Sequence, residues 1–198
     1  MRGKLIVVSG PSGVGKSTVV KKVMEQSPNL HFSVSVTTRP KRPSETEGVS
    51  YFFVDQEKFL EMIQREELLE YAQYVENYYG TPAVPVDDSL ACGDDILLDI
   101  EPQGALNVKR LRPEAILVFL AAPSFSVLES RLRGRGDTAP ELIEKRLKQA
   151  RWEYSQAPNY DYVVVNDDVD VAVRELLSII TAEKCKTKER MNYLKEDF

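Results

Sequence analysis

The sequence is poor in the residues that build disulfide frameworks and metal centres. Its 198 residues include one histidine, one tryptophan and two cysteines, Cys92 and Cys185. These two cysteines lack metal-ligand spacing and are too few for a framework of bridges. We therefore expect ordinary thiols in a reducing compartment.

Long apolar runs are also missing. The longest, at residues 5–8 and 115–122, fall far short of the ~20 residues that a membrane span requires. The apolar stretch near the N-terminus ends at Ser9, which is too short for a secretory signal. The sequence therefore predicts a cytoplasmic protein without a membrane partner.

An excess of positive charge is absent as well. The chain has 26 lysines and arginines against 31 aspartates and glutamates, a net charge of −5. Because nucleic-acid-binding proteins usually carry a basic face, we expect no nucleic-acid partner. An anionic ligand must instead be held by a local cluster of positive charge. Hydrophobic residues make up 42%, which is ordinary for a globular chain.

Short apolar runs alternate with helical patterns along the chain. Buried strands are predicted at residues 5–8, 96–98, 116–120 and 162–165. Helices are predicted at residues 16–26, 125–132, 141–154 and 169–183, with Ser124 and Asp168 as N-caps. The alternation indicates a three-layer α/β fold with a mostly parallel sheet covered on both faces.

Two segments depart from this alternation. Residues 33–81 suggest an α+β insert, with strands at 33–38, 50–54 and 68–75 and a short helix at 59–66. Residues 124–158 are mostly helical and rich in arginine. We expect a single unit over residues 1–198: a core (about 1–32, 84–123 and 159–198), an insert (about 33–83) and a lid (about 124–158). Such an arrangement suggests a cleft that closes.

The strongest motif lies between the first strand and the first helix. It fits the phosphate-binding loop pattern G-x-x-x-x-G-K-[ST] through Gly10, Pro11, Ser12, Gly13, Val14, Gly15, Lys16, Ser17 and Thr18. The N–H groups of such a loop point at one anion, and the helix adds its positive N-terminus. Lys16 brings charge to the β- and γ-phosphates, and the Ser17 hydroxyl can bind Mg²⁺. The motif predicts a nucleoside triphosphate site; a mere glycine-rich turn is the alternative.

Further polar residues indicate a second anionic ligand. Asp99 follows a predicted strand, at the edge where α/β sheets bind ligands, although a helix-capping acid is the alternative. Arg39 and Arg42 share a loop with Tyr51 nearby, and guanidinium groups match phosphate oxygens bidentately. A solvated basic loop remains the alternative there.

Glu70 interrupts the apolar pattern of residues 68–72. A carboxylate only accepts hydrogen bonds, and guanine offers two adjacent donors where adenine has an acceptor. Glu70 therefore suits guanine, and the hydroxyls of Ser35 and Thr81 can complete the recognition. The alternative is a strand residue that faces water.

Arginines also stand out in the predicted lid. Arg131 and Arg135 are four residues apart and share a helix face, and Arg146 follows in the next helix. Arginines on a mobile lid can close over a transferring phosphoryl group. The alternative is a basic surface helix paired with Glu129, Glu141 and Glu144.

Taken together, these blocks resemble the guanylate kinase family of ATP:GMP phosphotransferases. The resemblance spans about residues 4–183 and rests on residues 10–18, 33–42, 45–51, 70–73, 77–81, 98–104, 131–136 and 165–168. The most specific blocks are 33–42 followed by Gly48-x-x-Tyr51, and residues 77–81 and 98–104. The family has a core, a GMP-binding region and a lid.

The resemblance also implies a role for each candidate residue. The implied ATP site is residues 10–18 with Arg131 and Asn166. The implied GMP site is Ser35, Arg39, Arg42, Tyr51, Glu70, Tyr79, Thr81 and Asp99. The implied catalytic residues are Lys16, Arg39, Asp99, Arg135 and Arg146, with Ser17 binding the metal. Many members have Asp where this chain has Glu101, so no metal role is assigned to Glu101.

The implied reaction transfers the γ-phosphate of ATP to GMP, and to dGMP, in purine nucleotide metabolism, with Mg²⁺ and in-line attack by the GMP phosphate oxygen. One alternative is a non-catalytic guanylate-kinase-like module that binds phosphopeptides, although such modules typically have a degraded phosphate loop. Another is a P-loop kinase for a different small acceptor, which should lack the set Ser35, Glu70 and Thr81. Both a monomer and a homo-oligomer remain open.

Overall fold

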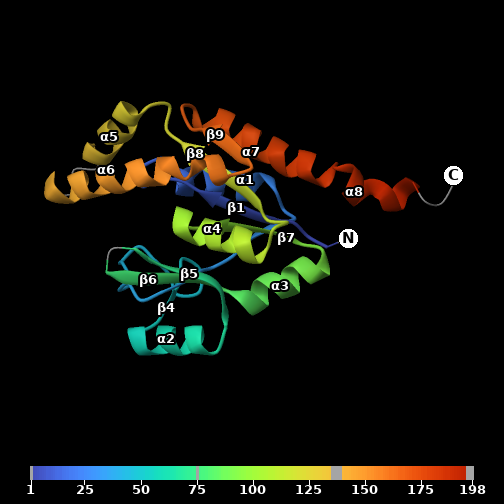
Figure 1. The fold of residues 1–198 in the computed structure, drawn as a ribbon, viewed down its shortest axis with the longest axis horizontal. Helices are drawn as coiled ribbons and strands as arrows, with labels where there is room; N and C mark the ends of the chain where they lie inside the picture. Colours follow the sequence, from blue (N-terminus) through green and yellow to red (C-terminus); the bar gives the residue numbers. More distant parts are fainter. Residues whose placement is uncertain (1, 75, 135–139, 195–198) are drawn as a thin grey trace.

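The structure, a computed structural model, describes residues 2–74, 76–134 and 140–194. Five strands within these ranges form a parallel sheet in the order β2-β7-β1-β8-β9 (Figure 1). They are β1 (Leu5–Ser9), β2 (Leu30–Phe32), β7 (Asp95–Asp99), β8 (Ile116–Ala121) and β9 (Tyr162–Val165). The prediction of an α/β fold with a mostly parallel sheet is confirmed.

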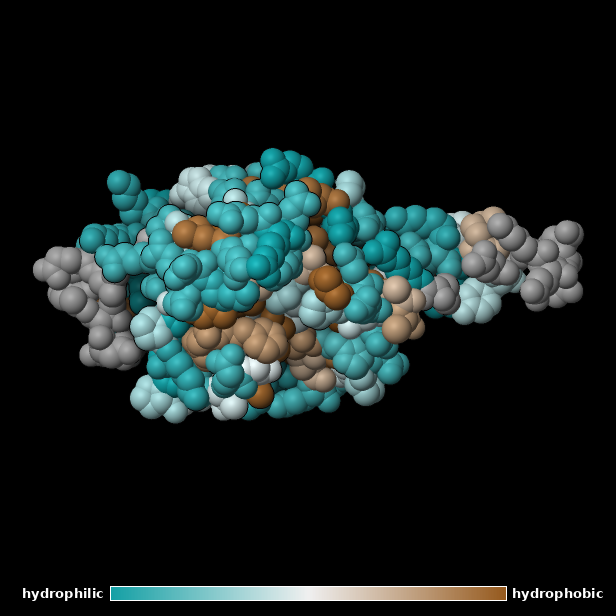
Figure 2. All heavy atoms as spheres, turned by 90° about the horizontal axis from the view of Figure 1, so that it is seen from below, coloured by the Kyte–Doolittle hydropathy of each residue, from teal (hydrophilic) through white to brown (hydrophobic). Residues whose placement is uncertain are grey.

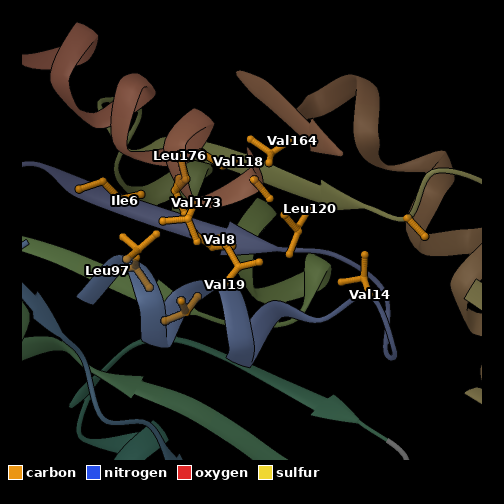
Figure 3. Close-up of a cluster of buried hydrophobic side chains, with 14 of the residues drawn as sticks. Ile6, Val8, Val14, Val19, Leu97, Val118, Leu120, Val164, Val173 and Leu176 are labelled. Atoms are coloured by element: carbon orange, nitrogen blue, oxygen red, sulfur yellow. The ribbon is translucent and has the colours of Figure 1, made fainter. Parts of the chain in front are cut away.

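Helices cover both faces of this sheet, and the side chains of β1 show why. Ile6 and Val8 belong to one buried cluster, whereas Leu5 and Val7 belong to the other, because successive strand residues point to opposite faces. The first cluster includes side chains of α1 (Lys16–Gln26) and α7 (Val169–Lys184) (Figure 3). The second includes side chains of α3 (Ala83–Cys92) and α4 (Pro102–Leu111).

Two of the predicted helix starts rest on local capping. Ser124 Oγ accepts a hydrogen bond from the Val127 N–H at 3.2 Å, at the start of α5 (Phe125–Arg133). Asp168 Oδ1 accepts from the N–H groups of Asp170 and Val171 at the start of α7. Each cap satisfies N–H groups that have no partner inside the helix. Both N-cap predictions are confirmed.

The insert forms a second sheet, in the order β4-β3-β6-β5. Its elements are β3 (Val36–Thr37), β4 (Phe52–Phe53), α2 (Gln56–Gln64), β5 (Leu68–Tyr74) and β6 (Asn77–Pro82). The strands predicted at 33–38 and 50–54 are therefore wrong in extent, because β3 and β4 span two residues each. The helix predicted at 59–66 begins three residues earlier, because Asp55 caps it by accepting from the Lys58 N–H at 2.7 Å.

The arginine-rich segment contains α5 and α6 (Pro140–Ser155), followed by the 3₁₀ helix η1 (Ala157–Asn159). Leu128 and Leu132 of α5 and Ile143 and Leu147 of α6 join the first buried cluster. Predicted site residue Arg135 lies outside the described residues. The helical prediction for the segment is confirmed for the parts that the structure describes.

The chain then runs from α7 into α8 (Thr187–Arg190) and η2 (Met191–Leu194), which extend past the sheet on the side where the N-terminus lies (Figure 1). Of the helices in the described ranges, none combines the length and the apolar character that crossing a bilayer demands. Cys92 and Cys185 are exposed thiols. From below, the molecule presents a mainly hydrophilic face whose apolar side chains gather near its middle (Figure 2).

Candidate active site

The phosphate-binding loop connects the end of β1 to the start of α1, and two of its glycines are required by space and backbone conformation. Gly10 has φ +148°, and a Cβ there would lie 2.2 Å from the Leu120 carbonyl oxygen. Gly15 has φ +96°, and a Cβ there would lie 2.5 Å from Asn166 Nδ2. Both positions have little room for a side chain, so the loop can pass close to β8 and β9.

Lys16 lies at the centre of the charge in this region. Its Nζ donates to the Gly10 carbonyl oxygen at 3.0 Å and lies 3.8 Å from Asp99 Oδ1. Burial favours the neutral amine, but the carboxylates of Asp99, Glu101 and Glu153 outweigh it and raise the Lys16 pKa above its ordinary value. The side chain therefore stays charged at any physiological pH.

A cavity of about 200 Å³ lies beside the loop, between the core and the insert. Its lining consists of Ser35, Arg39, Arg42, Glu45, Tyr51, Glu70, Ala72, Tyr79, Gly80, Asp99, Ile100 and Glu101. The structure therefore brings together every residue of the predicted GMP set except Thr81, which instead contacts Glu70 directly. We call this cavity the acceptor cavity.

Glu70 is the buried acid of the acceptor cavity. Its residue is 5% exposed, and its Oε1 accepts a hydrogen bond from the Thr81 hydroxyl at 2.7 Å. Burial raises the Glu70 pKa to about 7, although the Thr81 bond acts in the opposite direction. The alternative of a strand residue that faces water is therefore wrong.

An irregularity of β5 helps to bury this acid. Leu68 pairs with Pro82 and Glu70 pairs with Thr81, so Leu69 has no partner in the register of β6. Such a bulge redirects the side chains that follow it. Leu69 and Glu70 are each 5% exposed, although they are consecutive.

Glu45, which was not among the predicted site residues, binds Arg39 and the backbone of Arg42 at one end of the acceptor cavity. Arg39 Nη2 donates to Glu45 Oε1 at 2.6 Å, and the Arg42 N–H donates to Glu45 Oε2 at 2.8 Å. The Arg39 guanidinium also lies 5.5 Å from the centroid of the Tyr51 ring. Glu45 lies three residues after Arg42, which could have marked it as a local partner.

A second cavity is lined by the phosphate-binding loop, and we call it the loop cavity. It is lined by Pro11, Ser12, Gly13, Gly15, Lys16, Ser17, Tyr51, Asp99 and Glu101. Tyr51, Asp99 and Glu101 line this loop cavity and the acceptor cavity alike. A phosphate held by the loop and an anion held by Arg39 and Arg42 would therefore face each other across these three side chains.

The predicted lid arginines have different surroundings. Arg131 Nη1 donates to the Asn166 carbonyl oxygen at 3.0 Å and, more weakly, to the Val14 carbonyl oxygen at 3.4 Å. Asn166 Nδ2 donates to the same Val14 oxygen at 2.7 Å. These contacts tie the C-terminal part of α5 to the phosphate-binding loop. Arg146 lies half-buried on α6.

Surface pairing does occur between α5 and α6, at a different arginine. Arg133 donates to Glu129 Oε1 and to Glu144 Oε1 at 2.7 and 2.8 Å. The alternative of a paired basic helix is therefore realised by Arg133, which was not a candidate site residue.

Sequence interpretation also missed Glu153, a carboxylate of α6 that is 1% exposed. Burial and the charge of Glu101 raise its pKa to about 7, whereas Lys16 and Gln149 act in the opposite direction. Its position in an amphipathic helical pattern gave no signal of burial. The acids around Lys16 thus come from β7, the following loop and α6.

The loop cavity also contains oxygen donors of the kind that Mg²⁺ prefers. The Ser17 hydroxyl and the carboxylates of Asp99 and Glu101 line the same space. The described ranges contain no cluster of three histidine, cysteine or acidic side chains that could hold a metal alone. This donor set fits Mg²⁺, because that ion usually combines one or two protein oxygens with substrate phosphates and water.

Comparison with known proteins places this geometry among guanylate kinases. A family model described as guanylate kinase matches residues 2–183. Guanylate kinase of Thermus thermophilus is 53% identical over 184 residues, covering 93% of this chain and 83% of that protein. Guanylate kinase of Carboxydothermus hydrogenoformans is 47% identical over 192 residues, covering 97% and 94%. The crystal structure of guanylate kinase from Anaplasma phagocytophilum is similar at a TM-score of 0.83 and 35% identity, covering 99% of this chain and 95% of that one.

Proposed function

The chain belongs to the guanylate kinase family, and from this premise we propose how its two adjoining cavities carry out the reaction. It is an ATP:GMP phosphotransferase, a nucleoside monophosphate kinase that transfers the γ-phosphate of ATP to GMP. The observation that carries the proposal is that the loop cavity and the acceptor cavity share Tyr51, Asp99 and Glu101.

ATP occupies the loop cavity in this proposal. The N–H groups of residues 10–18 and the Lys16 ammonium hold its phosphates. Asn166 lies beside the adenine: its Oδ1 is buried and has no hydrogen-bond partner in the part of the chain that the structure describes. A buried acceptor of this kind suits the exocyclic amine of adenine. Arg131 holds the Val14 and Asn166 carbonyls and so fixes the edge of this site.

GMP occupies the acceptor cavity, with its phosphate towards the shared residues. Arg39, Arg42, Tyr51 and Tyr79 hold the phosphate, and Glu45 keeps Arg39 in place. At the other end the Glu70 carboxylate accepts from the two donors of the guanine edge, and Ser35 and Thr81 supply hydroxyls. Adenine would leave this acid facing an acceptor, which costs binding free energy.

Transfer then requires positioning and neutralisation of charge rather than a strong base, because a phosphate monoester is largely ionised at neutral pH. Lys16 and the arginines Arg39, Arg135 and Arg146 balance the negative charge of the two facing phosphates. Asp99 lies 3.8 Å from Lys16 and orients groups at the junction of the cavities. The Ser17 hydroxyl would hold Mg²⁺, which supplies further positive charge at the β- and γ-phosphates.

We also propose that the chain works as a core, an insert at about 33–83 and a lid at about 124–158. Closing the lid and insert over both nucleotides would exclude water, which would otherwise hydrolyse ATP. Cytoplasmic location, the lack of nucleic-acid and membrane partners, and the choice between monomer and homo-oligomer stay predictions of the sequence.

The test is ATP consumption with GMP, dGMP, AMP, CMP and UMP offered separately to the wild type and to Glu70→Gln. We expect turnover with the guanine nucleotides, and a Glu70→Gln variant whose KM rises for GMP and stays near normal for ATP. Glu57→Gln, an exposed acid of α2, is the matched control and should behave like the wild type. Equal turnover with AMP, or an unchanged KM for GMP in Glu70→Gln, would overturn the proposed guanine site.

A further inference from the structure

Gly104 makes a contact at the acceptor cavity that none of the roles above includes. It is buried in the first turn of α4, which packs against β5. A Cβ at this position would lie 2.3 Å from Glu70 Oε2 and 3.0 Å from Glu70 Cδ. The Glu70 carboxylate therefore occupies space that the side chain of any other residue at position 104 would need.

Both oxygens of this carboxylate therefore have neighbours that are far away in the sequence. Oε1 accepts from the Thr81 hydroxyl of β6 at 2.7 Å, and Oε2 lies against the bare Cα of Gly104 in α4. The Thr81 hydroxyl therefore holds one oxygen, and the missing side chain of Gly104 leaves room for the other.

Nothing in the local backbone requires glycine at position 104. Positive φ angles occur at Gly10, Gly13, Gly15, Gly48 and Gly93 among the glycines of the described ranges, and Gly104 is not one of them. Glycine within a helix is also less favourable than alanine. The next nearest atom to a Cβ at this position would be Ile100 Cδ1 at 3.4 Å, an ordinary contact.

Alanine at position 104 would therefore displace the acid rather than the helix. Ala105 and Val108 of α4 are buried in one cluster with Leu69 of β5, which holds the helix on the strand. The Glu70 carboxylate, by contrast, is the end of a flexible side chain and can turn away. The fold can adapt to the extra methyl group, whereas the direction in which Glu70 presents its oxygens cannot be kept.

We propose that Gly104 is a positioning residue for guanine recognition: its missing side chain creates the space in which Glu70 presents its carboxylate to the base. The inference rests on the proposed function, in which Glu70 binds guanine. It makes position 104 a determinant of nucleotide specificity that acts through Glu70 and does not touch the reacting phosphates.

The test is a double-mutant cycle in the full chain, built from Gly104→Ala and Glu70→Ala. Gly104→Ala alone should raise the KM for GMP about tenfold, the scale of one lost hydrogen bond to a charged group. The KM for ATP should stay within about twofold, and the Tm should be equal or higher because alanine favours the helix. Gln103→Ala, an exposed residue of the same turn, is the matched control and should change none of these.

The second arm of the cycle identifies the route of the effect. In the Glu70→Ala background, Gly104→Ala should cause no further rise in the KM for GMP, because the group that it displaces is gone. An equal rise in both backgrounds would mean a direct clash with GMP and would overturn the inference. A fall in Tm together with a raised KM for ATP would indicate general damage to the fold and would overturn it too.

The cycle also separates this inference from the proposed function. If Glu70→Ala raises the KM for GMP and Gly104→Ala does not, the guanine site stands and the role of Gly104 is wrong. If Glu70→Ala leaves the KM for GMP unchanged, guanine is bound elsewhere. The proposed role of Glu70 in guanine binding and the role of Gly104 are then both wrong.

Discussion

GMP binding should release a proton near neutral pH, because guanine requires the ionised form of Glu70. Burial raises the Glu70 pKa to about 7. Both donors of the guanine edge need acceptors, so GMP selects the carboxylate over the protonated acid. The carboxylate fraction increases with pH, and the affinity for GMP should therefore increase through pH 7 and become constant above about pH 8.

The magnitude follows from the titration of a single group. With a pKa of about 7, roughly a tenth of the Glu70 side chains are ionised at pH 6 and roughly nine-tenths at pH 8. The affinity for GMP should therefore be about tenfold weaker at pH 6 than at pH 8 because of Glu70 alone. At pH 7, binding should release about half a proton from this residue.

Isothermal titration calorimetry in buffers of different ionisation enthalpy measures both quantities. Because a phosphate monoester itself titrates near pH 6, the wild type must be compared with Glu70→Gln, which retains the contribution of the phosphate and loses that of the acid. The difference between the two proteins should be about half a proton at pH 7. Identical proton release in the two proteins would refute the assignment of this titration to Glu70.

The same titration also affects the stability of the unliganded protein. A folded-state pKa above the unfolded value means that stability is lost as pH rises from about 4.5 towards 7. Glu70→Gln should therefore be more stable than the wild type at pH 8, by up to about 3 kcal/mol, and the difference should shrink to about 1 kcal/mol or less at pH 5. Urea unfolding at the two pH values measures this difference, and an equal difference at both would contradict the argument.

Three further substitutions probe other parts of the site and the fold. Lys16→Met should lower kcat by ~10²–10³-fold with an unchanged Tm, since it removes charge at the transferring group. A kcat near that of the wild type in steady-state kinetics would contradict the proposed role of the phosphate-binding loop. Thr81→Val should raise the KM for GMP about tenfold by leaving Glu70 Oε1 without its donor, whereas Thr81→Ser should not; equal KM values for the two variants would show that the hydroxyl is irrelevant. Asp168→Ala should cost ~1 kcal/mol of unfolding free energy in urea without changing either KM, because it removes the cap of α7; an unchanged midpoint would mean that the cap contributes nothing.

The core strands could be predicted because their signals are local and strong. Apolar runs give β1, β7, β8 and β9 to within one residue at either end, and α1 was predicted with both its ends. The predicted burial of residues 162–165 is wrong in part, because β9 is an edge strand and its Val163 and Val165 are exposed. Two helix starts followed from capping residues, Ser124 and Asp168. At both of these helix starts, residues near one another in the chain supply the capping contacts.

The insert was harder because its elements depend on partners distant in sequence. β6 reads Asn-Tyr-Tyr-Gly-Thr-Pro and has no apolar alternation, yet it pairs with both β3 and β5. The edge strand β2 and the helices α3 and α4 were not predicted, because short or weakly patterned segments take their structure from the sheet beside them. Asp55 as the cap of α2 was a local signal that was overlooked.

The sequence alone determined the phosphate-binding loop, because its glycine spacing, lysine and following helix form one continuous segment, within which Lys16 Nζ donates to the Gly10 carbonyl oxygen. Only the tertiary structure decided the environment of Glu70. Its burial depends on a bulge in β5, its hydrogen bond on Thr81 of β6, and the space for its Oε2 on Gly104 of α4. These elements meet only when the chain is folded, since side-chain burial and pKa depend on neighbours that the linear order does not bring together.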